Sequence, residues 1–296
     1  MARHSALTAR ALRETAATWL QAGKHAMVVR VQDIKGSTPR ESGTRMLVGP
    51  HEVHGTIGGG HLEWQAIDLA RQALREHPQP SAWQQTFALG PTLGQCCGGV
   101  VVLAFEPLDA SGLSAWQLPP PRFHLELHGA GHVGQAIVQL LRDQDCSVRW
   151  IDERPAEDQH EDHGPGLPSP RMLADLPPHI HFVPTDRAED EVPDAPAGAF
   201  HLVLTHRHDL DLRIIHAVLR RGDFAFAGLI GSMTKRARFL HRLEAMGVPH
   251  ETLARLTCPI GLPGLTGKEP AVIAVSVVAQ LLMQASHAPA TRPHMG

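Results

Sequence analysis

The stretch FHLELHGAGHVG, residues 123–134, decides the fold of this 296-residue chain. An apolar run ends at Gly129, and Gly131 and Gly134 follow with G-x-G-x-x-G spacing directly before a helical pattern. In such a unit the first glycine permits the tight turn, the second lets a pyrophosphate approach the backbone, and the third lets the helix pack closely on the strand. The stretch therefore predicts the opening strand, turn and helix of a Rossmann-like parallel sheet.

The residues after this turn continue the alternation of strands and helices. Strands are expected at 147–151, 179–183, 201–205 and 224–230, and helices at 211–220, 232–246 and 270–284. Asp152 follows Gly129 by about 20 residues, where an acidic side chain accepts from a ribose hydroxyl in dinucleotide-binding sheets. Segment 153–198 is rich in Pro, Asp and Glu, so we expect it to be exposed and loosely ordered apart from its one strand. The turn predicts a site for NAD(P) or another nucleotide; the alternative is that its glycines serve packing alone.

The residues before this turn predict a separate, glycine-rich α/β domain. Helices are expected at 6–21 and 62–73, and strands at 26–31, 45–48 and 100–105. Residues 108–122 are rich in Pro, Ser, Ala and Gly, which is typical of a linker. The predicted organisation is therefore a first domain at 1–107, a linker at 108–122 and a Rossmann-like domain at 123–296.

Three motifs mark the first domain: GSTPRE at 36–41, GTIGGG at 55–60 and QCCGG at 95–99. Consecutive glycines can arrange adjacent backbone N–H groups around an anion, which here would involve Gly58, Gly59 and Gly60. Arg40 and Arg45 supply planar guanidinium groups suited to a phosphate. The alternative is a pair of tight turns in which these arginines pair with Glu41 and Glu63.

The adjacent thiols Cys96 and Cys97 lie in a glycine-flanked loop, where the chain can pass close to a ligand. Neighbouring side chains on extended backbone point to opposite faces, so one thiol can face a ligand while the other packs inward. A zinc site would need a second cysteine pair at matching spacing, which the sequence lacks. The alternative is two buried, apolar thiols.

Composition narrows the class of protein. A net charge of −3 provides no general basic field for nucleic acid. The sequence contains no unbroken apolar run of about 18 residues, so we expect no membrane span. Four cysteines, two of them adjacent, do not form a disulfide framework, and the first 30 residues lack the apolar core of a signal peptide. These features favour a cytoplasmic location.

Two clusters in the second domain left alternatives open. His206 and His208, with the aspartates beside them, could hold a divalent metal, contact a polar ligand or partner, or form an N-cap and hydrogen-bond network. Ser232 is expected to cap the following helix. Lys235 and Arg236 then lie near the positive end of that helix, so either an anion or acidic partner relieves the repulsion or solvent does.

These motifs together resemble the xanthine dehydrogenase accessory proteins of the XdhC/CoxI type. The resemblance spans roughly residues 36–282, in the family's order, and includes GSTPRESGTRMLV, GTIGGGHLE, LGQCCGG, HGAGHVGQAI, LTHRHDLDL, GLIGSMTKRARF and CPIGLPGLTGKEP. GSTPRE, GTIGGG and QCCGG in combination are far more specific than the glycine turn alone.

The resemblance implies a chaperone that binds molybdenum cofactor (molybdopterin), protects it during sulfuration by a cysteine desulfurase and delivers it to apo-xanthine dehydrogenase. It implies a thiol near the molybdenum, for which Cys97 or Cys96 is the candidate, with Cys258 as a further thiol. It also implies a homodimer. We expect a maturation factor without catalytic residues rather than an enzyme; the alternative is an NAD(P)-dependent oxidoreductase that uses the Gly129–Gly134 turn.

Overall fold

The computed structural model describes residues 8–38, 40–78, 80–89, 99–153 and 166–287. The chain divides into two compact units, Met1–Pro120 and Pro121–Gly296. Cys96 and Cys97 lie outside the described residues, so the predictions made for these two thiols are not addressed by the structure.

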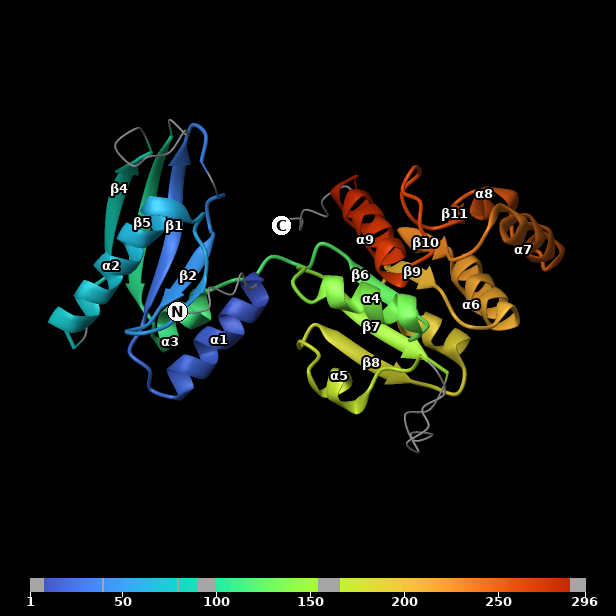
Figure 1. The fold of residues 1–296 in the computed structure, drawn as a ribbon, viewed down its shortest axis with the longest axis horizontal. Coiled ribbons are helices and arrows are strands. Elements are labelled where there is room, and N and C mark those ends of the chain that lie inside the picture. Colours follow the sequence, from blue (N-terminus) through green and yellow to red (C-terminus); the bar gives the residue numbers. More distant parts are fainter. Residues whose placement is uncertain (1–7, 39, 79, 90–98, 154–165, 288–296) are drawn as a thin grey trace, which may run out of the picture. The chain divides into compact units, whose positions relative to one another are not determined.

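The first unit contains a five-stranded antiparallel sheet with the strand order β3-β2-β1-β5-β4 (Figure 1). Its strands are β1 Met27–Lys35, β2 Arg45–Val48, β3 Val53–Gly55, β4 Trp83–Ala88 and β5 Val100–Pro107. Its helices are α1 Ala9–Gln21, α2 Gly60–Glu76 and α3 Ala110–Ala115. The strands β3 and β4 and the helix α3 were not expected from the sequence.

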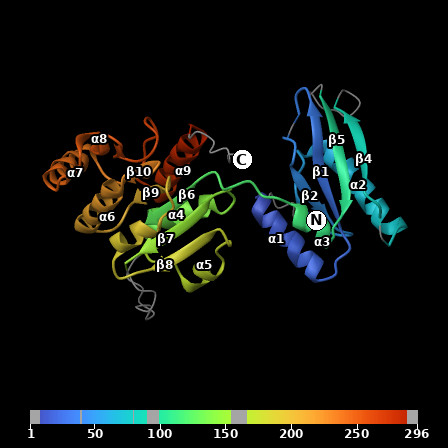
Figure 2. The same ribbon diagram turned by 180° about the vertical axis from the view of Figure 1, so that it is seen from behind.

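Alternation along β1 gives the sheet two buried faces. Met27 and Val29 join the core that α2 covers, together with Leu62 from that helix. Val28 points the other way, into a smaller core that it shares with Leu12 of α1. The helices α2 and α1 therefore cover opposite faces of the sheet. In the reversed view of Figure 2, α2 lies behind the strands.

The segment expected as a linker differs from that expectation. Within 108–122, Asp109 caps α3 by accepting from the Gly112 amide at 2.7 Å, and Trp116 is only 4% exposed. The Arg13 side chain donates to the Trp116 carbonyl at 3.0 Å, which ties this segment to α1. Composition resembles that of a linker because the segment is short and proline-rich, yet one large aromatic side chain is enough to anchor it.

The second unit contains a six-stranded parallel sheet with the order β11-β10-β9-β6-β7-β8. Its strands are β6 His124–His128, β7 Ser147–Asp152, β8 Ile180–Pro184, β9 Phe200–Val203, β10 Phe226–Leu229 and β11 Leu256–Thr257. Its helices are α4 His132–Leu141, α5 Pro170–Ala174, the 3₁₀ helix η3 Ala188–Asp194, α6 His208–Arg221, α7 Met233–Ala245, α8 His250–Leu253 and α9 Pro270–His287. The predicted Rossmann-like parallel sheet is confirmed.

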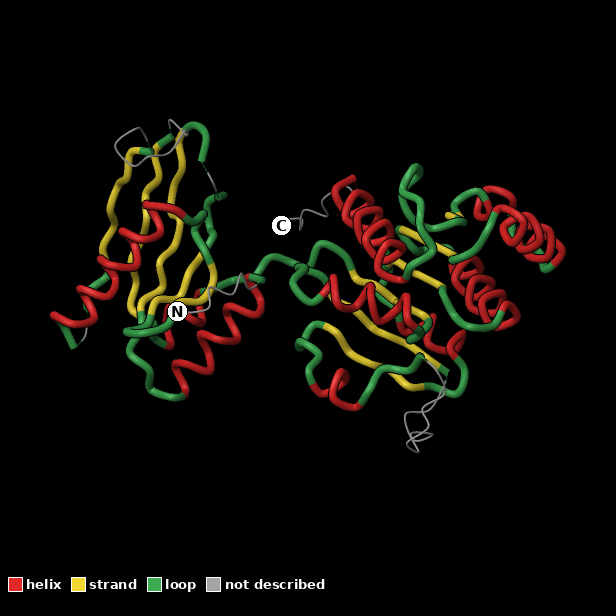
Figure 3. The backbone as a smooth tube through the Cα atoms, viewed as in Figure 1, coloured by secondary structure: helices red, strands yellow, loops and turns green. Residues whose placement is uncertain are grey.

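Helices cover both faces of this sheet, as the tube in Figure 3 shows. Residues of α4 and α9 share one core with Leu125 and Leu127 of β6, while α6 and α7 share the other with Val203 of β9. The chain reverses direction across the sheet between β6 and β9, because β7 and β8 lie on one side and β10 and β11 on the other. Ligands of open α/β sheets bind at this switch point, outside the carboxyl ends of the strands.

Segment 153–198 is more ordered than its composition suggests. Beyond residues 154–165, which are not described, it contains α5, β8 and η3, and Ala188 and Val192 are buried against the sheet. The acidic residues of η3 are partners for arginines: Glu191 pairs with Arg149 at 2.5 Å and Glu189 with Arg213 at 2.9 Å. Charge-rich composition resembled disorder because those partners lie far away in the sequence.

Helix α9 is long and apolar enough to cross a membrane by length and composition alone. The criterion is a mean hydropathy, whereas the expectation of no membrane span rests on the lack of an unbroken apolar run. One face of the helix, including Ala274, Val277 and Leu281, belongs to the core beside α4. Because core helices also meet the criterion, the finding is weak evidence for a membrane span.

Candidate functional site

The glycine turn after β6 lies at the switch point, and its three glycines have different surroundings. Gly129 has φ +121°, and a Cβ there would lie 2.5 Å from the Leu204 carbonyl oxygen. A Cβ on Gly134 would lie 2.2 Å from the Gly129 carbonyl oxygen, so strand and helix are in close contact. A Cβ on Gly131 would meet no atom within 4 Å. Only Gly131 therefore presents open space that an approaching ligand could use.

Asp152 was predicted to face a ribose, but its carboxylate contacts the turn. Oδ2 accepts from the Ala130 backbone N–H at 2.6 Å, and the residue is buried. Trp150 donates from its indole N–H to the Gly129 carbonyl at 3.1 Å. The strand β7 thus holds the turn from inside, and one N–H of the glycine turn already has an anionic partner.

A buried ion pair joins the ends of β9 and β10. Lys235 Nζ lies 2.5 Å from Asp211 Oδ2 and donates to the Ile230 carbonyl at 2.8 Å. Asp211 Oδ1 accepts from the Thr205 amide at 3.0 Å and from its hydroxyl at 2.7 Å. Lys235 therefore has an acidic partner within the chain, Asp211. Ser232 caps α7 by accepting from the Lys235 amide at 3.2 Å, as predicted.

His206 is exposed on the loop between β9 and α6, and His208 is exposed as the first residue of α6. Among the residues described, no group of three or more His, Cys, Asp or Glu is placed to hold a metal ion. Glu153 connects this loop to α6, because it pairs with Arg207 of the loop and with Arg213 of the helix at 2.9 Å each. A metal at these histidines stays a prediction.

Cys258 follows β11 at the same carboxyl edge of the sheet. It is buried, and burial raises the pKa of its thiol, although the nearby Lys235 and Arg236 lower it. The thiol form is therefore favoured at neutral pH, and a metal would have to displace its proton. The sequence had nominated Cys258 from the resemblance alone.

In the first unit, the glycine cluster encloses a carboxylate of the chain itself. Glu63 Oε2 accepts from the Ile57 amide at 3.0 Å, the Gly59 amide at 3.1 Å and the Thr56 hydroxyl at 2.5 Å. The Gly58 amide donates to the Thr56 hydroxyl oxygen at 3.1 Å. The predicted phosphate site at Gly58–Gly60 stays a prediction, and a phosphate there would compete with Glu63 for donors.

The two candidate arginines line a single cavity of about 210 Å³. Arg40 and Arg45 meet there with Thr56 of the GTIGGG motif and with Trp116 of the segment expected as a linker. The Arg45 guanidinium lies 4.8 Å from the centre of the Trp116 ring. Burial, followed by repulsion from Arg30, lowers the pKa of Arg45, and attraction to Glu106 opposes this in part.

Gly99, the last glycine of QCCGG, lies against the segment that begins the GSTPRE motif. A Cβ on Gly99 would lie 2.4 Å from the Ser37 carbonyl oxygen and 2.7 Å from that of Lys35. The end of QCCGG is therefore in close contact with the start of GSTPRE. Sequence reasoning identified all three motifs but missed Arg30 and Trp116, since neither belongs to a motif.

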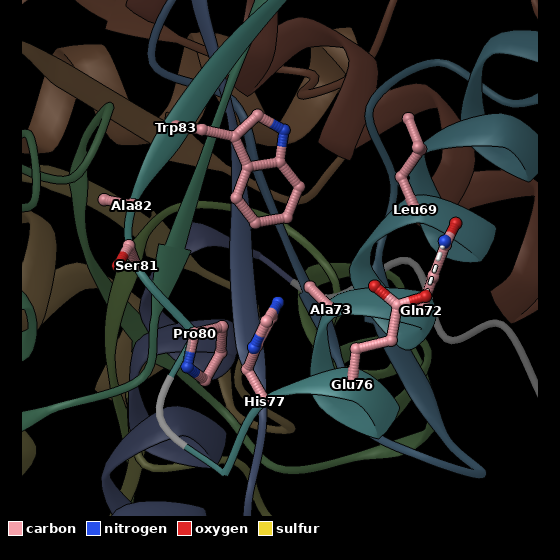
Figure 4. Close-up of a pocket in the computed structure, with 9 residues that line it drawn as sticks. All are labelled: Leu69, Gln72, Ala73, Glu76, His77, Pro80, Ser81, Ala82 and Trp83. Carbon is pink, nitrogen blue, oxygen red and sulfur yellow. Dashed lines mark hydrogen bonds between the residues drawn. The ribbon is translucent and has the colours of Figure 1, made fainter.

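A larger cavity of about 450 Å³ lies between the end of α2 and the start of β4 (Figure 4). It is lined by Trp83, Leu69 and His77 among others, and Gln72 donates to Glu76 beside it at 2.8 Å. It contains none of the motif residues. The candidate residues Arg40 and Arg45 line the smaller cavity instead, and those of the second unit lie at the carboxyl edge of the parallel sheet.

Comparison with known families agrees with this division of the chain. The XdhC Rossmann domain family matches residues 125–281, and the XdhC and CoxI family matches residues 19–86. The first match alone covers more than half of the chain. The chain belongs to the XdhC family. The predicted family resemblance is thereby confirmed.

This XdhC-family chain is similar to the uncharacterized protein YqeB of Escherichia coli strain K12, with 29% identity over 266 residues. The aligned part is 88% of this chain and 44% of YqeB, so the chain spans less than half the length of that relative. It also superimposes, with a TM-score of 0.71 and 18% identity, on a Bacillus halodurans protein whose crystal structure is described as a xanthine dehydrogenase. That match covers 95% of this chain and 98% of the other, and at this identity it shows the fold alone.

Proposed function

We propose that this XdhC-family chain acts in the maturation of a xanthine dehydrogenase, with molybdenum cofactor as its cargo. Membership of the XdhC family, matched in both units, is the observation that carries the proposal. In this role the chain holds the cofactor during sulfuration by a cysteine desulfurase and then releases it to the apoenzyme. A homodimer in the cytoplasm is part of the same proposal.

The chemistry of the cargo fits features of the first unit. Molybdopterin ends in a phosphate, and the cavity at Arg40 and Arg45 offers two guanidinium groups to an anion. Soft thiolate sulfur suits a soft metal centre, which is the role proposed for Cys97 or Cys96. A carrier needs such contacts to be few, because it must also release its cargo.

Anaerobic incubation with molybdenum cofactor, followed by gel filtration and metal analysis, tests the proposal. The wild-type chain is expected to elute with molybdenum near one equivalent per chain and to activate a xanthine dehydrogenase apoenzyme. Cys97→Ala should retain less molybdenum, whereas Cys146→Ala removes a thiol of the Rossmann core and serves as the matched control. Wild-type protein that elutes free of molybdenum would contradict the proposal, and unchanged retention in both Cys96→Ala and Cys97→Ala would remove the thiols from it.

The alternative is an oxidoreductase that uses NAD or NADP. The strand order and the open position of Gly131 favour a dinucleotide at the switch point. Asp152 fits less well, because its carboxylate already accepts from Ala130 and is buried. If the site binds such a cofactor, the cofactor would supply hydride chemistry, while the Gly129–Gly134 turn would hold its pyrophosphate. Calorimetry with each dinucleotide at millimolar concentration tests this, and absence of heat for both removes the alternative.

A further inference from the structure

The cavity at Arg40 and Arg45 is cationic. Its other described lining residues are apolar, glycine or threonine, and none of them is acidic: Ala9, Leu12, Gly43, Thr44, Thr56 and Trp116. The Thr44 and Thr56 hydroxyl groups also lie in the lining, but each already donates its hydrogen, to the Glu41 carbonyl at 2.8 Å and to Glu63 at 2.5 Å. The donors that remain for phosphate oxygens are therefore the planar guanidinium groups of the two arginines.

On the neighbouring strands, Arg45 faces a cation and has only a longer-range attraction to one carboxylate, that of Glu106, which partly opposes the lowering of its pKa. Arg45 of β2 is the register partner of Arg30 of β1, so two cations face each other across an antiparallel pair. Glu106 of β5 pairs with Arg30 at 2.7 Å. Among the described residues, the ion pairs include no carboxylate for Arg45 or for Arg40. An external anion in this cavity would therefore offset a repulsion that the sheet imposes.

The glycine cluster of the GTIGGG motif, next to the cavity, already binds an anion of the chain itself, the Glu63 carboxylate. There the backbone N–H groups of Ile57 and Gly59 are already donated to Glu63. Thr56 connects the two places, because it lines the cavity and donates to Glu63 at 2.5 Å. The internal carboxylate orders the glycine loop and holds Thr56 in position, and the arginines are left for an anion from outside.

We propose that this cavity is a binding site for the dianionic phosphate of a small-molecule phosphate monoester, held by Arg40 and Arg45. The volume of about 210 Å³ suits a terminal group, with the rest of the molecule outside. Whole ligands generally need pockets of about 300–1,000 Å³. The proposal deepens the proposed function and rests on it for the identity of the natural monoester, but phosphate binding can be measured by itself.

Calorimetry on the full chain with methyl phosphate tests the site. Dimethyl phosphate is the matched control ligand, because it has one negative charge and no terminal phosphate. Wild-type protein should bind methyl phosphate at least about tenfold more tightly than dimethyl phosphate, since two charge-assisted forks favour the dianion. Arg45→Gln and Arg40→Gln should each weaken methyl phosphate by about tenfold or more.

Arg75→Gln is the control variant, because Arg75 is exposed on α2, lies outside the cavity and removes the same charge. Arg40 is also exposed, so Arg40→Gln tests the site even where Arg45→Gln fails to fold. Wild-type protein that shows no preference for the dianion, or an Arg40→Gln variant that binds like Arg75→Gln, overturns the proposal. Cofactor uptake is measured separately: loss of phosphate binding in the variants supports the site even if wild-type protein takes up no molybdenum.

Discussion

Single residues decide how the glycine motifs are used. In the turn after β6, Gly129 and Gly134 are required by close backbone contacts, whereas Gly131 is not. In the GTIGGG motif, the backbone donors converge on Glu63. The same residue type therefore serves close packing in one position, leaves open space in another and provides backbone donors to an internal carboxylate in a third.

The two glycines at the start of α4 can be separated experimentally. Gly134→Ala should lower the free energy of unfolding by about 2 kcal/mol or more, because its Cβ would overlap the Gly129 carbonyl. Gly131→Ala has φ −70° and open space, so it should cost less than about 1 kcal/mol. Urea denaturation of both variants measures the difference, and equal losses would contradict the assignment of the two glycines.

Glu63 offers a second test at this scale. Glu63→Gln replaces a buried carboxylate that accepts three hydrogen bonds, so it should lower the free energy of unfolding by about 2 kcal/mol. Glu76→Gln on the same helix alters an exposed side chain and is the control. Thermal and urea unfolding provide the measurement; a loss no larger than that of the control would show that the loop does not depend on this anion.

At the scale of elements, ion pairs join helices to the ends of strands. The pair between Lys235 of α7 and Asp211 of α6 connects the loops that follow β9 and β10. Glu153 after β7 pairs with Arg213 of α6. At the carboxyl edge of the parallel sheet, ion pairs therefore connect the segments that follow neighbouring strands.

Removing one partner of the buried pair should be costly. Lys235→Met leaves the Asp211 carboxylate buried without its cation, and we expect a loss of about 3–5 kcal/mol in the free energy of unfolding. Arg142→Met removes the partner of the largely exposed Asp175 and should cost no more than about 1 kcal/mol. Denaturant titration compares the two, and a small effect of Lys235→Met would mean that water reaches Asp211.

For the molecule as a whole, buried histidines predict sensitivity to acid. His128 and His201 stack at 5.9 Å between the central strands of the parallel sheet. Burial, then repulsion from His201 and Arg149, holds the pKa of His128 well below 6.5. Burial, then repulsion from Arg221, lowers the pKa of His201 to about 4. Both ring nitrogens of His128 lack a hydrogen-bond partner among the described residues, which fits an uncharged ring.

The direction of the pH dependence follows from these lowered pKa values. Below pH 6.5 the unfolded chain protonates both rings while the folded chain does not, so stability falls as the pH falls. Each histidine contributes a slope of up to about 1.4 kcal/mol per pH unit, and that of His201 ends near pH 4.

Urea unfolding between pH 7 and pH 4 measures this dependence. His201→Gln should flatten it, whereas His241→Gln, at an exposed position, should leave it unchanged. A wild-type stability that is constant between pH 6.5 and pH 4 would contradict the prediction.

Local patterns in the sequence were sufficient for the Rossmann-like sheet, the glycine turn, the Ser232 cap and the family. These features depend on residues close together along the chain, where alternation and glycine spacing act directly on the backbone. Elements without such a pattern, such as β4 and η3, were missed, because they are stabilised by contacts with other segments: β4 pairs with β5, and Glu191 of η3 pairs with Arg149.

Only the tertiary structure decided which partner each polar side chain has. Asp152 contacts Ala130 and Glu63 occupies the glycine loop, while Arg40 and Arg45 line a cavity together with Trp116. Strand register and the folding of distant segments against each other set these contacts, and periodicity does not encode them. The sequence by itself therefore determined the fold and the family, and long-range packing determined which charges remain available to a ligand.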